Sequence, residues 1–261
     1  MELRMSGRNA LITGGSKGLG LAIARSFAEA GANVAIVARE PQGLEEARSA
    51  ITGAAANAKV VTVAADVAGA DGCRKAFEAA DKAFSRVDVL VNNAGTSQRG
   101  PFVELTDEIW QHDIDLKLFA AIRLCRLAFP GMKARRWGRI INVLNTGAKA
   151  PPPTGAPTAV TRAAGMALTK VLSGEGAPHN VLVNALLVGN IESNQWVKRH
   201  AAENKGRSLS DYYAEMGKRI PMGRVGTSQE FANMALFLAS DAGSYITGTA
   251  INVDGGLSPV V

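Results

Sequence analysis

The sequence predicts an α/β protein: a doubly wound parallel sheet of about seven strands with helices on both faces. One observation is a series of apolar, β-branched runs that are near-continuous rather than alternating, as in strands covered on both faces. A second is that stretches of helical period lie between these runs, which favours right-handed parallel crossovers. A third is that only two regions interrupt this alternation, so we expect one domain over residues 1–261.

The expected strands are short runs dominated by Val, Ile, Leu and Ala. They are Asn9–Thr13, Asn33–Val37, Val60–Ala64, Asp88–Asn92, Arg139–Leu144, Val181–Leu186 and Ala250–Asp254. Among the helices between them, Leu44, Ala47 and Ile51 share one face and predict a buried stripe. Another helix is expected after Thr227, because Thr227 and Glu230 have the spacing of a capping box.

Two segments interrupt the alternation. Residues 149–157 are rich in Pro, Gly and Ala, which predicts a loop. Residues 193–222 predict a small insertion with short helices. Because such insertions at the carboxyl edge of a parallel sheet commonly form the mouth of a site, we expect a substrate lid within the single domain.

The composition is that of an ordinary globular protein, with 47% hydrophobic and 20% charged residues. No apolar run approaches the roughly 18 residues of a membrane span, and the N-terminus lacks the apolar region of a signal peptide. Cys73 and Cys125 are far apart and fit packing in a reducing cytoplasm. His112, His179 and His200 lack metal-ligand spacing, so we expect no metal.

The formal net charge of +6 is compatible with anionic partners. Its densest basic run contains Lys133, Arg135, Arg136 and Arg139. Because no nucleic-acid motif accompanies this run, we expect a solvated surface patch and no nucleic-acid partner.

A glycine-rich turn, residues 13–20, joins the first strand to a helix. Glycine lets the main chain approach a pyrophosphate closely, and the helix N-terminus behind it offers unpaired N–H groups and positive potential. This turn between a strand and a helix therefore predicts a dinucleotide site. The expected contacts are Gly14, Ser16, Lys17, Gly18, Leu19 and Gly20.

The end of the second strand bears on which dinucleotide binds. Proteins that prefer NAD usually place an acidic residue there for the ribose 2′-hydroxyl, and this chain has Ala38 followed by Arg39. Arg39 and Lys17 together suit a 2′-phosphate, which Arg can bind through two parallel hydrogen bonds. We therefore expect NADP, the alternative being a solvated Arg39.

Over nearly its whole length the chain resembles the short-chain dehydrogenase/reductase family, in particular its 3-oxoacyl-(acyl carrier protein)-reductase-like members. The Thr-Gly-x-x-x-Gly-x-Gly turn matches the family signature, and residues 92–95 match its Asn-Asn-Ala-Gly motif. The resemblance implies a Rossmann-type fold and an oligomer, tetramer or dimer, because residues 252–256 resemble a final strand that often lies in a tetramer interface. It also implies further cofactor contacts at Asp66, Val67, Asn93, Ala94, Gly95, Gly189, Ile191 and Ser193.

The family's catalytic set is an Asn, a Ser and a Tyr-x-x-x-Lys pair, and this chain departs from it at every position. The corresponding residues here are Asp115, Asn145, Thr158 and Arg162. Thr158 and Arg162 share a helix face, and Arg162 can still bind ribose hydroxyls but cannot give up its proton. Asn145 can donate to a carbonyl oxygen, whereas the threonine hydroxyl is too weak an acid for proton transfer.

Asp115 is a candidate for the missing acid/base, with a structural ion pair to Arg162 as the alternative. Two functions therefore stay open. One is an NADP(H)-dependent oxidoreductase that acts on a small carbonyl or alcohol substrate with non-standard proton delivery. The other is a catalytically inactive NADP-binding sensor or partner protein.

Overall fold

The computed structural model describes residues 3–202 and 206–261. Seven parallel strands form one sheet in the order β3-β2-β1-β4-β5-β6-β7. These strands are β1 Asn9–Thr13, β2 Asn33–Ala38, β3 Val60–Ala64, β4 Val89–Asn92, β5 Gly138–Asn145, β6 Val181–Val188 and β7 Ala250–Val253. The predicted fold is confirmed, and each predicted run lies in one of these strands with small differences at the ends.

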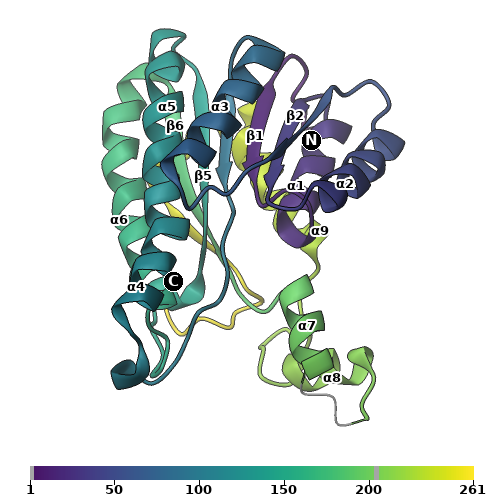
Figure 1. Cartoon of the computed structure of the whole chain (residues 1–261), viewed down its shortest axis with the longest axis vertical. Helices are drawn as coiled ribbons and strands as arrows, with labels where there is room; N and C mark the ends of the chain where they lie inside the picture. The colour runs from purple at the N-terminus through teal and green to yellow at the C-terminus, as the bar shows by residue number, and fades with distance from the viewer. Residues whose placement is uncertain (1–2, 203–205) are drawn as a thin grey trace.

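Helices cover both faces of the sheet (Figure 1). One face carries α1 Gly18–Glu29, α2 Pro41–Ala54 and α9 Ser228–Ala239, which meet in a core containing Ile23, Phe27 and Phe231. The other carries α3 Ala70–Phe84, α5 Ala120–Ala134 and α6 Thr158–Gly176, with a core containing Leu124 and Cys125 on the side of α3 and α5. Strands buried on both faces are apolar at consecutive positions, which explains the near-continuous runs in the sequence.

The order of the strands reverses between β1 and β4. From β1 the chain builds outward through β2 and β3, and it then crosses back to place β4 on the other side of β1. The loops after β1 and β4 therefore diverge, which leaves a crevice at the carboxyl ends of the strands. Thr13 and Asn92 are the last residues of these two strands, so the glycine-rich turn and the Asn-Asn-Ala-Gly segment border this crevice.

The elements beyond the carboxyl ends of the strands complete this edge. Helix α4 Asp107–Ile114 passes into a π-helical turn, Asp115–Phe119, that continues as α5. The predicted lid segment contains α7 Asn194–Ala202 and α8 Leu209–Gly217, which project together from the body of the molecule (Figure 1). Its residues 203–205 lie outside the described part of the chain. Gln195 Nε2 lies 3.4 Å from the carbonyl oxygen of Gly95, so α7 reaches the crevice; its action as a lid stays a prediction.

The basic run at residues 133–139 differs from the solvated patch that we predicted. Arg139 is only 1% exposed, and its guanidinium donates to the carbonyl oxygens of Gly138 and Asn180. The same guanidinium lies 4.4 Å from the ring centre of Trp137, a favourable cation–π arrangement. The prediction was wrong for Arg139, because this residue belongs to β5 and not to the surface.

The two cysteines are buried and free, as packing residues. Burial raises the pKa of Cys73 to about 11 and that of Cys125 to about 12, so neither is a thiolate near neutral pH.

In the described residues, no helix has the length and apolar character needed to cross a bilayer. Within the same residues, no group of three or more His, Cys, Asp or Glu side chains is placed to hold a metal ion.

Candidate active site

The glycine-rich turn has a shape that only glycine permits at its tightest point. A Cβ on Gly20 would lie 2.2 Å from the carbonyl oxygen of Gly14 and 2.6 Å from Asn93 Nδ2. Asn93 Nδ2 also donates to the carbonyl oxygens of Thr13, at 2.9 Å, and Gly14, at 3.2 Å. The end of β4 thereby holds the turn at the end of β1.

The start of α1 presents free backbone donors to the crevice. Lys17 is the N-cap residue, and its side chain makes no capping hydrogen bond. The first helical turn carries no acidic side chain, so its N–H groups and the positive end of the helix dipole are available to an anion. This arrangement fits a dinucleotide pyrophosphate, and the predicted contacts Ser16, Gly18 and Leu19 lie on it.

Two cations flank the corner between this turn and the end of β2. The Gly15 N–H donates to the carbonyl oxygen of Val37 at 3.2 Å, which fixes the turn beside β2. The stem of Lys17 lies over Gly43 of α2, with Cε 3.6 Å from the position of a Cβ there. Arg39 directly follows β2 and is exposed. Neither cation forms an ion pair with another residue in the described part of the chain, so both are available to a 2′-phosphate.

Two of the predicted cofactor contacts, Asp66 and Val67, follow the end of β3, the strand next to β2. Val67 is buried. The carboxylate of Asp66 accepts a hydrogen bond from the Ala68 N–H at 3.0 Å, which shapes the loop.

A buried ion pair stands at the centre of the site. The side chains of Asp113 and Lys117 are 1% and 3% exposed, and Lys117 Nζ donates to Asp113 Oδ1. Lys117 Nζ also donates to Thr158 Oγ1 at 2.8 Å. The Thr158 hydroxyl accepts from the Gln98 N–H at 3.0 Å and lies 3.4 Å from Asp113 Oδ1. Two segments far apart in sequence, the loop after β4 and the helical segment that carries Asp113 and Lys117, thus converge on the hydroxyl of Thr158.

The environment of Lys117 makes its ammonium group easier to deprotonate. Burial lowers the pKa of Lys117 to about 8, and the neighbouring charge of Arg162 acts in the same direction. The carboxylate of Asp113 opposes them, because it favours the charged amine. A side chain with a pKa near neutral pH can both give and accept a proton.

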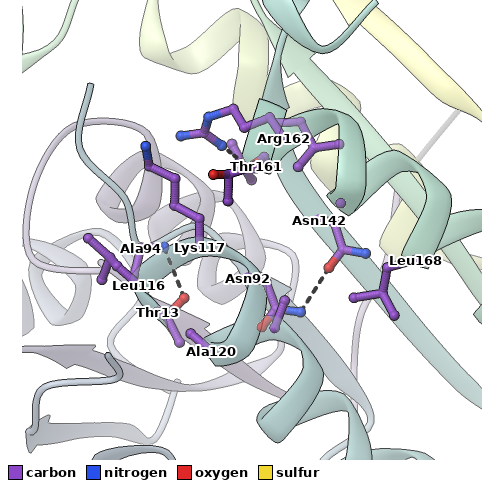
Figure 2. Close-up of a pocket in the computed structure, with 14 residues that line it drawn as sticks. Thr13, Asn92, Ala94, Leu116, Lys117, Ala120, Asn142, Thr161, Arg162 and Leu168 are labelled. Atoms are coloured by element: carbon purple, nitrogen blue, oxygen red, sulfur yellow. Dashed lines mark hydrogen bonds between the residues drawn. The ribbon is translucent and has the colours of Figure 1, made fainter. Parts of the chain in front are cut away.

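Arg162 lies beside Lys117, and Figure 2 shows both side chains reaching the same side of the site. Its Nη1 donates to the carbonyl oxygen of Val143 at 2.6 Å. Its Nη2 faces Gly95 and would lie 3.0 Å from a Cβ at that residue. Burial lowers the pKa of Arg162 to about 10, so the group stays cationic near neutral pH.

A cavity of about 20 Å³ lies beneath these two cations (Figure 2). That volume is close to what one water molecule needs. Asn92 Nδ2 donates to Asn142 Oδ1 across its wall at 2.8 Å, and Asn142 Nδ2 continues to Thr169 Oγ1 at 2.9 Å.

The four residues at the positions of the family's catalytic set do not all lie together. The π-helical turn directs Asp115 away from the ion pair of Asp113 and Lys117. Its carboxylate instead accepts a hydrogen bond from Gln111 Nε2 at 2.9 Å and forms an ion pair with Arg123 at 3.3 Å. The predicted ion pair between Asp115 and Arg162 is therefore wrong. Asn145 ends β5, and its Oδ1 is buried without a hydrogen-bond partner in the described residues. Of the predicted four, Thr158 and Arg162 lie at the ion pair.

Lys117 is the residue that the sequence reasoning missed. Two signals for it were present: a lysine between Leu116 and Leu118, and the four-residue spacing from Asp113, which places two opposite charges on one helix face. The π-helical turn that brings Lys117 to Thr158 has no comparable sequence signal. Such turns occur frequently at functional sites.

The loop after β6 contains three of the predicted cofactor contacts, Gly189, Ile191 and Ser193. The Gly189 N–H donates to the carbonyl oxygen of Val253 at 3.1 Å, and a Cβ on Gly189 would lie 2.4 Å from Asp254 Cβ. Ile191 is buried and forms a β-bridge with Gly226. The carbonyl oxygen of Ser193 accepts from the Trp196 N–H at 3.0 Å at the start of α7. The loop therefore lies between the sheet edge and α7.

The chain is similar to known proteins over nearly its whole length. Residues 14–258 match the family model described as Enoyl-(Acyl carrier protein) reductase. The chain is 32% identical over 260 residues to the 3-oxoacyl-(acyl-carrier-protein) reductase FabG of Aquifex aeolicus, covering 98% of this chain and 100% of that protein.

Two solved structures are similar over essentially the whole chain. The first is L-sorbose reductase from Gluconobacter frateurii complexed with NADPH and L-sorbose, with a TM-score of 0.95, 36% identity and full coverage of both chains. The second is an NADPH-bound short chain oxidoreductase from Pseudomonas aeruginosa PAO1 that contains an atypical catalytic center, with a TM-score of 0.91, 36% identity and 99% coverage of each chain.

Proposed function

Because the chain belongs to the short-chain dehydrogenase/reductase family, we propose that it is an NADP(H)-dependent oxidoreductase in which Lys117 handles the proton. Its substrate would be a small carbonyl compound or the corresponding alcohol. The observation that carries the proposal is the buried contact of Lys117 with Asp113 and Thr158, at the place where the family resemblance calls for an acid/base. Turnover without the family's tyrosine becomes chemically reasonable once this amine is available.

The residues of the crevice fit NADP from one end to the other. The first turn of α1 would hold the pyrophosphate, Lys17 and Arg39 the 2′-phosphate, and Arg162 the nicotinamide ribose. The contacts proposed from the family pattern complete the set: Asp66, Val67, Asn93, Ala94, Gly95, Gly189, Ile191 and Ser193. When bound, NADPH supplies the hydride.

Each side chain at the centre has a separate task. The Lys117 ammonium donates a proton to the substrate oxygen in the direction of reduction, and the neutral amine accepts one from the alcohol in the direction of oxidation. Asp113 and Thr158 hold Lys117 in place, because both contact its Nζ. The Asn145 amide is proposed to donate to the substrate oxygen, as the family's serine hydroxyl does.

The proposal is tested by titrating the protein with NADPH and NADH, followed by reduced-nicotinamide fluorescence, and then adding a panel of ketones and aldehydes. We expect NADPH to bind more tightly than NADH and at least one carbonyl compound to be reduced. Arg39→Ser is expected to weaken NADPH binding about tenfold or more with little change for NADH, since one charge-assisted contact contributes about 1.5–3 kcal/mol. Tight NADPH binding without turnover across the panel would favour the inactive sensor or partner.

The pH dependence of turnover gives a second prediction. Because reduction needs the Lys117 ammonium, whose pKa is about 8, its rate constant should be level below that pH and fall above it. The rate constant for oxidation should rise up to the same pH. Asp113 raises the pKa of Lys117, so Asp113→Asn is expected to move both transitions to lower pH. Profiles unmoved by this substitution would show that another group titrates.

A homo-oligomer, tetramer or dimer, remains part of the proposal. Strand β7 is an open edge of the sheet with partly exposed residues, Val171 of α6 is 59% exposed, and Tyr245 is fully exposed. Open edges and exposed apolar side chains are features that partner chains cover. Light scattering should give a mass of two or four times the chain mass, and a monomer at micromolar concentration would contradict this.

A cytoplasmic location likewise stays a proposal, supported by the free buried cysteines.

A further inference from the structure

The loop after β4 places a third cation beside the ion pair. The Gln98 N–H of this loop donates to Thr158 Oγ1 at 3.0 Å. The next residue, Arg99, forms an antiparallel β-bridge with Pro157, the residue before Thr158. The backbone of Arg99 is therefore held at the edge of the site, while its side chain is exposed.

The positive charge of Arg99 acts on both Lys117 and Arg162. The charges that act on the pKa of Lys117 are those of Arg162, Asp113 and Arg99, and Arg99 also lowers the pKa of Arg162. The cations Lys117, Arg162 and Arg99 therefore stand against the single carboxylate of Asp113, so positive charge is in excess at this group. In the described part of the chain, Arg99 has no ion-pair or side-chain hydrogen-bond partner.

Such an excess is unfavourable unless an anion offsets it. Lys117 is already paired with Asp113, and Arg162 is committed to Val143 and to the proposed ribose site. Arg99 alone has a free guanidinium, whose planar fork matches the oxygens of a carboxylate or a phosphate. Its position at the rim would let it bind such a group while the carbonyl oxygen of the same molecule reaches Lys117.

We propose that the substrate carries an anionic group, a carboxylate or a phosphate ester, a few atoms from its reacting carbonyl, and that Arg99 binds this group. The inference rests on the proposed function, since it assumes a carbonyl substrate at Lys117. It assigns Arg99 as the residue that determines specificity for charge. The guanidinium contacts the remote end of the substrate and takes no part in proton transfer.

The test is a calorimetric titration of the NADP⁺-bound protein, which cannot reduce a carbonyl, with two matched pairs of probes. Acetoacetate is compared with acetoacetamide, and dihydroxyacetone phosphate with dihydroxyacetone. We expect the anionic member of at least one pair to bind about tenfold or more tightly than its neutral counterpart, as for one charge-assisted contact. Preference within the first pair identifies a carboxylate, and preference within the second identifies a phosphate.

Arg99→Gln is expected to bring the two members of the preferred pair to similar affinity and to leave binding of the neutral member nearly unchanged. Arg25→Gln removes an exposed arginine of α1 that pairs with Glu29, and it serves as the control for a general loss of charge. Equal binding within both pairs by the unaltered protein would overturn the proposal, and so would an unchanged preference in Arg99→Gln. Failure of the proposed function shows separately, as absent NADPH binding or absent carbonyl reduction.

Discussion

Lys117→Met is expected to lower the rate constant for carbonyl reduction by about 10²–10⁴-fold, the usual contribution of a positioned acid/base. NADPH affinity should change little, because Lys117 contacts Asp113 and Thr158 and not the glycine-rich turn. Single-turnover oxidation of bound NADPH, followed by absorbance at saturating carbonyl substrate, measures the chemical step directly. Lys82→Met, at the exposed end of α3, is the matched control and should retain full activity.

The stability of the variant has to be separated from its chemistry. Removing Lys117 leaves Asp113 as a buried carboxylate without its cation, and breaking a buried pair in this way costs about 3–5 kcal/mol. The double variant Asp113→Asn/Lys117→Met carries no buried charge at this pair and should recover much of that stability. It should nevertheless remain inactive, since the proton donor is still missing. A folded double variant with normal turnover would remove Lys117 from the mechanism.

Gly20→Ala is expected to abolish NADPH binding and to reduce the free energy of unfolding by about 1–3 kcal/mol, as overpacking does in a close-packed site. The added Cβ would lie 2.2 Å from the carbonyl oxygen of Gly14, so the turn would have to move away from α1. That movement would also disturb the Asn93 side chain, which holds both Thr13 and Gly14. Denaturant unfolding and NADPH fluorescence measure the two effects independently.

The control for Gly20→Ala is Gly174→Ala in α6. Apart from the neighbouring backbone of α6 itself, no atom of the described residues lies within 4 Å of the position that a Cβ would take on Gly174, so the helix accepts the methyl group without a clash. Alanine in a helix is about 1 kcal/mol more favourable than glycine, so this variant should be slightly stabilised and should bind NADPH normally. Unchanged NADPH affinity in Gly20→Ala would mean that the turn can widen, which would contradict the role assigned to it.

The fold was predictable because its signals are local and repeated. Each buried strand is an apolar run, and the Thr227–Glu230 capping box that predicted the start of α9 is present in the structure. The glycine-rich turn was equally predictable, because a single short segment contains both its glycines and the helix start behind them. In each of these cases, the residues that form the structural element are the same consecutive residues that carry its sequence pattern.

The centre of the site was not predictable in the same way. Asp115 was expected beside Arg162, and the π-helical turn sends it to Arg123 instead. The proposed role of Lys117 depends on an approach between the π-helical turn and α6 that no local pattern encodes, and the Gln98 N–H reaches Thr158 from a third segment. Family spacing pointed to Thr158 and Arg162, which lie beside the buried ion pair, but it could not show which side chain contacts them.

The hydroxyl of Thr158 has a consequence for how this site can have arisen. It is 1% exposed and already engaged by the ammonium of Lys117 and the N–H of Gln98, with Asp113 close by. A tyrosine ring at this position would need the volume that Lys117 and its neighbours fill, because the cavity beside them, about 20 Å³, has room for about one water molecule. Restoring one residue of the family's set would therefore clash with the others. The residues around Thr158 therefore form an interdependent group, and a tyrosine at position 158 would have to be accompanied by changes at the positions that contact this hydroxyl.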